Sequence, residues 1–135
     1  MHNNDTAIDL LRELVLAQLG DETAVQVVIA RRLKAAGCDV QEHDYDPADV
    51  LVKGEFALDT ARATGRRRAV VGTLPGDPRL PSLLMFAHPD GEPVGDTSDW
   101  LHDPFSGEIE DGRLYGWGVA DDLAGCAAAV LAIEN

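Results

Sequence analysis

Apolar residues near the N-terminus recur every three or four positions, which is the period of an amphipathic helix. This pattern predicts two helices, over residues 6–19 and 22–36. The apolar stripe of the first consists of Ile8, Leu11, Val15 and Leu19. The stripe of the second consists of Val25, Val28, Ile29, Leu33 and Ala36. Asp21 can cap the second helix, and a glycine follows each stripe as a stop signal. Both helices are expected to cover a sheet.

Short apolar runs bounded by turn residues predict strands over residues 38–45, 67–74 and 82–88, with a further short strand over 50–52. The run Ser82-Leu83-Leu84-Met85-Phe86-Ala87-His88 lacks polar alternation, so we expect a buried strand there. Asp111-Gly112 stands between two more short strands and is a strong signal for a tight hairpin turn.

A last helix is predicted to begin near Asp122, which can act as its N-cap. Its apolar stripe consists of Leu123, Cys126, Ala127, Val130 and Leu131. Strands that alternate with helices favour an α/β fold. The helical pattern still runs at Asn135, so we expect the chain to be the front part of a larger protein.

Composition narrows the classes of function. The chain has 135 residues, 45% of them hydrophobic, which is enough for one modest core. Its net charge of −13 argues against nucleic acid and anionic membranes as partners. No signal peptide or membrane-spanning run is recognised, so a cytoplasmic location is expected by default. Cys38 and Cys126 are expected to be buried free thiols.

The strand 82–88 would deliver His88 at its C-terminal end, where open α/β sheets bind ligands. Asp90 follows two residues later, so its side chain leans to the same face of an extended chain. A carboxylate beside a histidine fixes the imidazole tautomer and raises its basicity as a metal ligand. Asp121 precedes the last helix and could reach the same rim of the sheet. Each piece alone is weak, because a solvated turn or a simple helix cap would give the same residues.

The order of the sequence motifs from His88 to Asp122 is a more specific signal than any one of these residues. It runs through His88-Pro89-Asp90, Pro93-Val94-Gly95-Asp96, Trp100, Asp103-Pro104-Phe105-Ser106-Gly107, Ile109-Glu110-Asp111-Gly112-Arg113-Leu114-Tyr115-Gly116 and Asp121-Asp122. It closely resembles the M20 family of metallopeptidases and deacylases. The resemblance covers about a third of the chain. It implies the N-terminal portion, residues 1–135, of a metallo-aminopeptidase-like (Zn-peptidase) catalytic domain, with helices packed on a mixed sheet.

The resemblance also implies roles for three residues. His88 would be a terminal ligand of one metal ion, Asp121 the carboxylate that bridges two ions, and Asp90 the catalytic-centre residue that orients His88. The ions would be Zn²⁺ or Co²⁺, two per site in the full-length protein, and the peptide bond after Asp121 would be cis. The substrate would be a small molecule, a peptide or an N-acyl amino acid, and the full-length protein could form a homodimer.

Some expected parts of the family lie outside this sequence. The family's glutamate pair with its general base, a further carboxylate, a late histidine and the lid or dimerisation domain cannot be placed here. Two residues near Asp121 also depart from the pattern, because Leu123 stands where many relatives have lysine and Trp117 where many have arginine. These departures put the subgroup in doubt.

Three hypotheses follow. The first is the N-terminal part of a metal-dependent hydrolase of amide bonds, inactive as this chain alone. The second is a truncated, non-catalytic fragment or interaction module without metal binding. The third, magnesium-dependent phosphoryl transfer, is disfavoured because the sequence has no glycine-rich phosphate loop of the required pattern.

Overall fold

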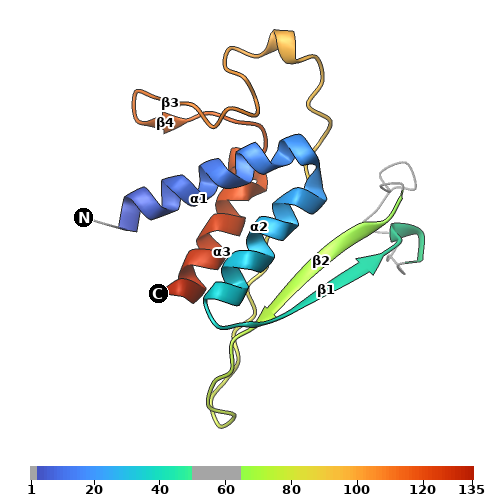
Figure 1. Cartoon of the computed structure of the whole chain (residues 1–135), viewed down its shortest axis with the longest axis vertical. Coiled ribbons are helices and arrows are strands. Elements are labelled where there is room, and N and C mark those ends of the chain that lie inside the picture. Colours follow the sequence, from blue (N-terminus) through green and yellow to red (C-terminus); the bar gives the residue numbers. More distant parts are fainter. Residues whose placement is uncertain (1–2, 50–64) are drawn as a thin grey trace.

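In the part of the chain that the structure describes, three α-helices form one body, with a long two-stranded ribbon beside them (Figure 1). The computed structural model describes residues 3–49 and 65–135. Helix α1 spans Asn3–Ala17 and continues into a 3₁₀ turn, Gln18–Gly20; α2 spans Glu22–Ala35, and α3 spans Ala124–Glu134. The predicted helices are therefore confirmed, with small shifts at their ends.

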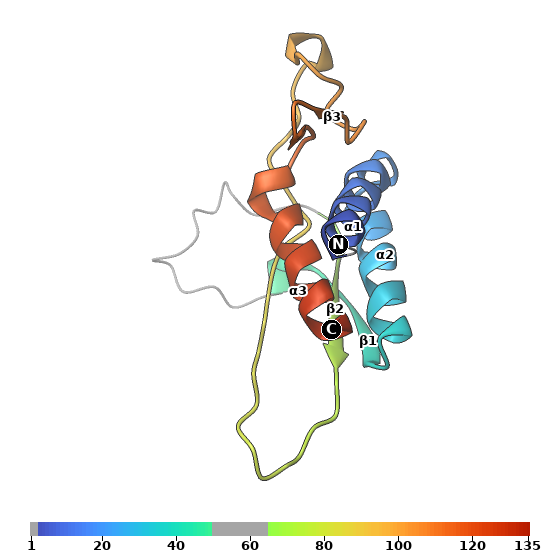
Figure 2. The same cartoon turned by 90° about the vertical axis from the view of Figure 1, so that its left-hand side faces the viewer.

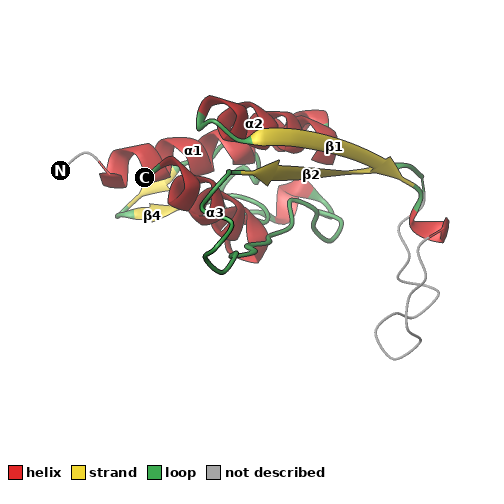
Figure 3. Ribbon diagram, turned by 90° about the horizontal axis from the view of Figure 1, so that it is seen from below, coloured by secondary structure: helices red, strands yellow, loops and turns green. Residues whose placement is uncertain are grey.

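Within residues 3–49 and 65–135, two antiparallel strand pairs accompany the helices. β1 (Asp39–Tyr45) pairs with β2 (Arg67–Thr73), and the short β3 (Ile109–Glu110) pairs with β4 (Arg113–Leu114). The β1–β2 ribbon runs alongside α2, and the β3–β4 hairpin lies apart from it (Figure 3). The predicted α/β class is confirmed, although the strand pairs among the described residues are all antiparallel.

The helices enclose a small apolar core. Its buried members are Leu10, Leu14, Val15, Val25, Leu123, Cys126, Ala127 and Val130. The stripe predicted for the first helix is therefore partly wrong, since Ile8 and Leu19 are exposed. That helix has apolar residues on more than one face, and packing against α3 selects the face of Leu10 and Leu14.

Local sequence signals correctly predicted one helix cap and one hairpin turn. The Asp21 carboxylate accepts hydrogen bonds from the backbone N–H groups of Thr23 and Ala24, at 2.7 and 3.2 Å, and so caps α2 as predicted. In the β3–β4 turn, Asp111 and Gly112 have φ values of 49° and 75°. A two-residue hairpin turn with the preferred twist needs positive φ at both positions, which Asp-Gly tolerates.

The predicted buried strand over residues 82–88 is wrong. These residues are extended but belong to no strand, and Leu83, Leu84 and Phe86 are 82%, 83% and 91% exposed. An apolar run becomes a strand only when another strand takes up its backbone hydrogen bonds, and the described residues supply none to this segment. The strand predicted at 50–52 lies outside the described residues.

Cys38 and Cys126 are both buried free thiols, as expected. Burial raises the pKa of the Cys126 thiol to about 11, and the nearby Asp122 carboxylate adds to the effect.

None of the helices within residues 3–49 and 65–135 is long and apolar enough to cross a membrane.

An ion pair ties the end of α3 to α2. Arg32 donates two hydrogen bonds of 2.6 Å to the two carboxylate oxygens of Glu134, and each side chain is 21% exposed. The hydrogen bonds from Arg32 lower the pKa of Glu134. The pair therefore stabilises the fold above the ordinary carboxylate pKa, and this contribution disappears as pH falls through the lowered pKa.

We predict that Glu134→Gln lowers the free energy of unfolding by about 1 kcal/mol at neutral pH, because it removes a partly buried, bidentate ion pair. The difference from the unmodified chain should vanish in acid. Urea denaturation at several pH values measures both effects. Asp77→Asn is the matched control, since it breaks the exposed Asp77–Arg79 pair within one loop and should have little effect. Equal losses from both substitutions would contradict the prediction.

Candidate metal centre

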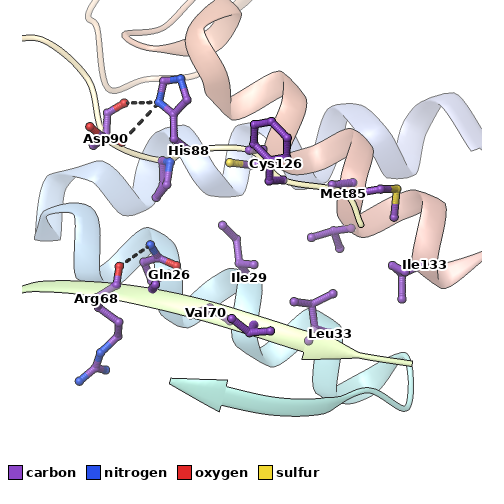
Figure 4. Close-up of a pocket in the computed structure, with 18 of the residues that line it drawn as sticks. Gln26, Ile29, Leu33, Arg68, Val70, Met85, His88, Asp90, Cys126 and Ile133 are labelled. Atoms are coloured by element: carbon purple, nitrogen blue, oxygen red, sulfur yellow. Dashed lines mark hydrogen bonds and ion pairs between the residues drawn. The ribbon is translucent and has the colours of Figure 1, made fainter. Parts of the chain in front are cut away.

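His88 lies at the end of the extended segment, with Asp90 against one ring nitrogen. Its Nδ1 is 3.2 Å from the backbone carbonyl oxygen of Asp90 and 3.3 Å from the Asp90 carboxylate oxygen Oδ1 (Figure 4). Both partners are acceptors, so the imidazole carries its proton on Nδ1. The neutral ring then presents an unprotonated Nε2, which is the form that binds a metal.

Asp121 faces that second nitrogen. Its Oδ1 lies 3.2 Å from Nε2 of His88. Two atoms bound at about 2.0–2.1 Å to one tetrahedral ion lie about 3.3 Å from each other, so the spacing suits two ligands of one ion. A neutral His88 and an ionised Asp121 would place two lone pairs face to face, which is favourable only with a cation between them.

A proton can be that cation. Partial burial lowers the pKa of His88, but the Asp90 carbonyl and the carboxylates of Asp90, Asp121 and Asp122 raise it more, and the net shift is upward. The same negative field that stabilises the imidazolium would also attract a divalent metal ion.

The turn Val119–Leu123 delivers Asp121 to this position. The peptide bond between Asp121 and Asp122 is cis, as the family resemblance implied. Leu123 follows it and is 1% exposed, which anchors the turn in the core. The Asp122 carboxylate accepts a 3.2 Å hydrogen bond from the backbone N–H of Gly125. Asp122 thus binds the first turn of α3, but the regular helix begins at Ala124 and its N-cap position is Leu123, so the predicted N-cap is one residue too early.

Helix α1 fixes the segment just before this turn. A Cβ on Gly116 would lie 2.8 Å from Cγ1 of Val15, so only glycine allows this approach. The buried Gln18 donates a 3.0 Å hydrogen bond from Nε2 to the backbone carbonyl of Trp117. The sequence analysis missed Gln18, because a glutamine near a helix end gives no signal of its distant partner.

Trp117 packs on the loop that carries Asp90. A Cβ on Gly91 would lie 2.9 Å from Cζ2 of the Trp117 indole, and Phe105 meets the same ring edge-on at a centroid distance of 6.1 Å. The Trp117 departure from the family pattern therefore has a structural role here, since its ring braces the backbone next to Asp90.

The two other histidines among the described residues lie elsewhere. His43 is on β1, opposite Ala69 of β2. His102 stacks on Tyr115 at 3.8 Å, and its Nδ1 is 3.0 Å from a carboxylate oxygen of Glu108. Neither histidine joins His88 and Asp121, and the sequence analysis missed the His102 cluster.

Among residues 3–49 and 65–135, no group of three or more His, Cys, Asp or Glu side chains could hold a metal ion. His88 and Asp121 match a nitrogen-and-oxygen ligand set for Zn²⁺ or Co²⁺. A catalytic zinc site normally takes three ligands from protein, so His88 and Asp121 by themselves would not complete one.

Comparison with known proteins agrees with the M20 resemblance of the sequence. Residues 84–135 match the sequence profile of peptidase family M20/M25/M40. Three relatives are named succinyl-diaminopimelate desuccinylase. The Leptothrix cholodnii protein is 30% identical over 95% of this chain and 30% of its own length, and the Methylibium petroleiphilum protein is 30% identical over 96% and 31%. The Rhodospirillum centenum protein is 49% identical over 41% of this chain and 14% of its own length.

The chain therefore spans less than a third of the length of these relatives. No solved structure matches it.

The first prediction at this site concerns the proton on His88. In the metal-free chain, an NMR titration should give His88 a pKa above 6.5, and Asp121→Asn should lower that pKa because it removes a facing charge. Asp111→Asn is the control. It removes one carboxylate charge from the β3–β4 turn, which does not contribute to the His88 shift, so the pKa of His88 should stay unchanged. Metal affinity should rise as pH passes upward through this pKa, since only the neutral imidazole binds.

The second prediction concerns the Gly91–Trp117 contact. Gly91→Ala should destabilise the fold by about 1–3 kcal/mol, because the added Cβ overpacks against the indole. Adding Trp117→Ala should produce a combined loss smaller than the sum of the two single losses. Gly76→Ala is the control, since a Cβ there meets nothing within 4 Å. Strict additivity in denaturation experiments would refute the contact.

Proposed function

The chain belongs to peptidase family M20/M25/M40 through residues 84–135, and from this premise we propose that residues 1–135 form the N-terminal portion of the catalytic domain of a metal-dependent amide hydrolase. The observation that carries the proposal is the 3.2 Å approach of His88 Nε2 to Asp121 Oδ1. Both residues, and Asp90, lie within the matched stretch.

Each residue has a defined task in this proposal. His88 is a terminal metal ligand through Nε2, and Asp121 is the bridging carboxylate, since its two oxygens can contact two ions. Asp90 holds the proton of the imidazole at Nδ1 and so keeps Nε2 free for the metal. When bound, two Zn²⁺ or Co²⁺ ions would polarise the scissile carbonyl and lower the pKa of a bound water.

The relatives narrow the substrate class. Their names describe removal of a succinyl group from an N-succinylated diamino acid. We therefore rank N-acyl amino acids with an acidic acyl group first and small peptides second. A small-molecule substrate fits a chain of net charge −13, because such a charge disfavours a nucleic-acid partner. The cytoplasmic location and the homodimer stay predictions.

The second candidate function is a non-catalytic fragment or interaction module. The partial ligand set within the described residues favours it for this chain alone. The two candidates agree that the chain should not turn over substrate alone, since the described residues offer only His88 and Asp121 as ligands and the family's general base cannot be placed in this sequence. General acid–base catalysis by itself typically contributes about 10²–10⁴-fold. They differ in what happens when the remaining polypeptide is supplied.

The test joins this chain to the part of the Leptothrix cholodnii desuccinylase that follows the aligned region. The chain alone and the chimera are loaded with Zn²⁺ or Co²⁺ and assayed with N-succinyl-diaminopimelate, other N-acyl amino acids and dipeptides. The chimera should be active and the chain alone inactive. In the chimera, His88→Ala and Asp121→Ala should abolish turnover, and Asp90→Ala should lower metal affinity or activity about 10–100-fold.

His43→Ala is the matched control, because this histidine lies on β1 outside the site and its removal should leave activity intact. Circular dichroism and gel filtration establish that each chimera is folded. Turnover by the chain alone that His88→Ala abolishes would overturn the fragment assignment. A folded, metal-loaded chimera inactive on every substrate would count against the enzyme.

A further inference from the structure

The extended segment that carries His88 receives no support from backbone pairing within the described part of the chain. After β2 the chain turns and returns as this segment, on the side of α3 (Figure 2). Residues 82–92 make no backbone–backbone hydrogen bond with any described residue. The 3.2 Å approach of His88 Nε2 to Asp121 Oδ1 nevertheless joins this segment to a turn anchored in the helical body. The approach therefore depends on side-chain packing.

Trp117 contacts the segment just beyond the histidine. A Cβ on Gly91 would lie 2.9, 3.3 and 3.4 Å from Cζ2, Cε2 and Cη2 of the indole, so the backbone of Gly91 lies directly against the ring. Gly91 follows Asp90, which provides both acceptors of His88 Nδ1, a backbone carbonyl and a carboxylate (Figure 4). The indole thus fixes the stretch of backbone that carries these two acceptors.

Trp117 itself is anchored to the body of the molecule. Its backbone N–H donates a 2.7 Å hydrogen bond to the carbonyl of the buried Pro104, and its own carbonyl accepts a 3.0 Å hydrogen bond from Nε2 of the buried Gln18. Phe105 meets the indole edge-on at a centroid distance of 6.1 Å. A residue whose two backbone polar groups are both held can impose its position on the segment that its ring touches.

The neighbouring contacts do not replace this one. Ala87 packs against the core and fixes the segment before His88. Beyond the histidine, the Trp100 indole donates a 3.1 Å hydrogen bond to the carbonyl of Val94. Both of these residues belong to the same loop, so their hydrogen bond does not tie the loop to the helices. The contact with the Trp117 indole ties the Asp90 side of the histidine to the body.

We propose that Trp117 is a positioning residue of the candidate metal centre. Its indole holds the Asp90 backbone against Nδ1 of His88, so that Nδ1 keeps the ring proton. Nε2 then stays free and directed at Asp121. The proposal rests on the proposed function for the metal ion itself, but its first consequence, the tautomer of the imidazole, concerns the metal-free chain.

The first experiment measures the tautomer of His88 in the metal-free 135-residue chain. Long-range proton–nitrogen NMR spectra distinguish the two neutral forms at about pH 9, well above an ordinary imidazole pKa. The unmodified chain should show mainly the Nδ1–H form. In Trp117→Leu the ratio of Nε2–H to Nδ1–H should rise about threefold or more, because Asp121 still accepts at Nε2 while Asp90 is no longer fixed.

Three variants separate positioning from general stability. Trp117→Phe keeps an aromatic ring and should retain most of the Nδ1–H preference. Val25→Ala weakens the fully buried core on α2, and Trp100→Leu removes the other tryptophan, so both should keep the tautomer of the unmodified chain. A shift in these two controls equal to that in Trp117→Leu would overturn the proposal. If Trp117→Leu does not fold, Trp117→Met fills more of the space without a ring and carries the same expectation.

A double variant tests the route through the backbone. Asp90→Ala removes the carboxylate but leaves the carbonyl at 3.2 Å from Nδ1, so part of the Nδ1–H preference should remain. Adding Trp117→Leu should remove the rest. Complete loss of the preference in Asp90→Ala alone would mean that the backbone held by the indole does not set the tautomer, and the proposal would be wrong.

The second experiment measures the Zn²⁺ affinity of the chimera by competition with a chromophoric chelator. Trp117→Leu should weaken binding about tenfold or more, the effect typical of residues that support a metal ligand, and Trp117→Phe should restore most of it. Unchanged affinity in a chimera that binds metal would overturn the role of Trp117, whatever the activity. A chimera that binds no metal, beside the expected tautomer shift in the chain, would count against the proposed function and leave the positioning of His88 supported by the spectra.

Discussion

The close approach of α1 to the turn before α3 is the contact on which the candidate site depends. Val15 lies so near Gly116 that no side chain fits there, and Gln18 binds the carbonyl of Trp117 one residue later. Leu123 then enters the core beside Leu14 and Val15. The first helix of the chain thereby positions an aspartate more than a hundred residues away, at Asp121. Core packing near Val15 or Gln18 therefore bears directly on the site.

The chemistry of the site follows from one electrostatic conflict. Asp90 holds the proton of His88 on Nδ1, so Nε2 turns a lone pair toward the Asp121 carboxylate at 3.2 Å. Only a positive charge makes this arrangement favourable. In the metal-free chain a proton meets the need, and the pKa of His88 rises accordingly. The same geometry would suit a divalent ion, in line with the proposed metal-dependent hydrolase.

The missing strand shows how tertiary context decides secondary structure. Residues 82–88 have the composition of a buried strand and adopt its extended backbone, yet no strand forms. Backbone pairing requires a partner at the correct distance, and β2 lies across a groove from this segment. The family match begins at residue 84, inside this segment.

The sequence by itself determined the features that depend on interactions between residues close together in the chain. Helical periodicity located α1, α2 and α3. Asp21 placed a helix cap and Asp111-Gly112 a turn, and the ordered motifs around His88 and Asp121 indicated the family. Each of these signals depends on neighbours within a few positions or on residue order. Tertiary structure alone decided which face of α1 is buried, the roles of Gln18 and Trp117, and the fate of residues 82–88. Those outcomes depend on contacts between segments that are distant in the chain, and a local sequence pattern does not reveal which distant residue will make the contact.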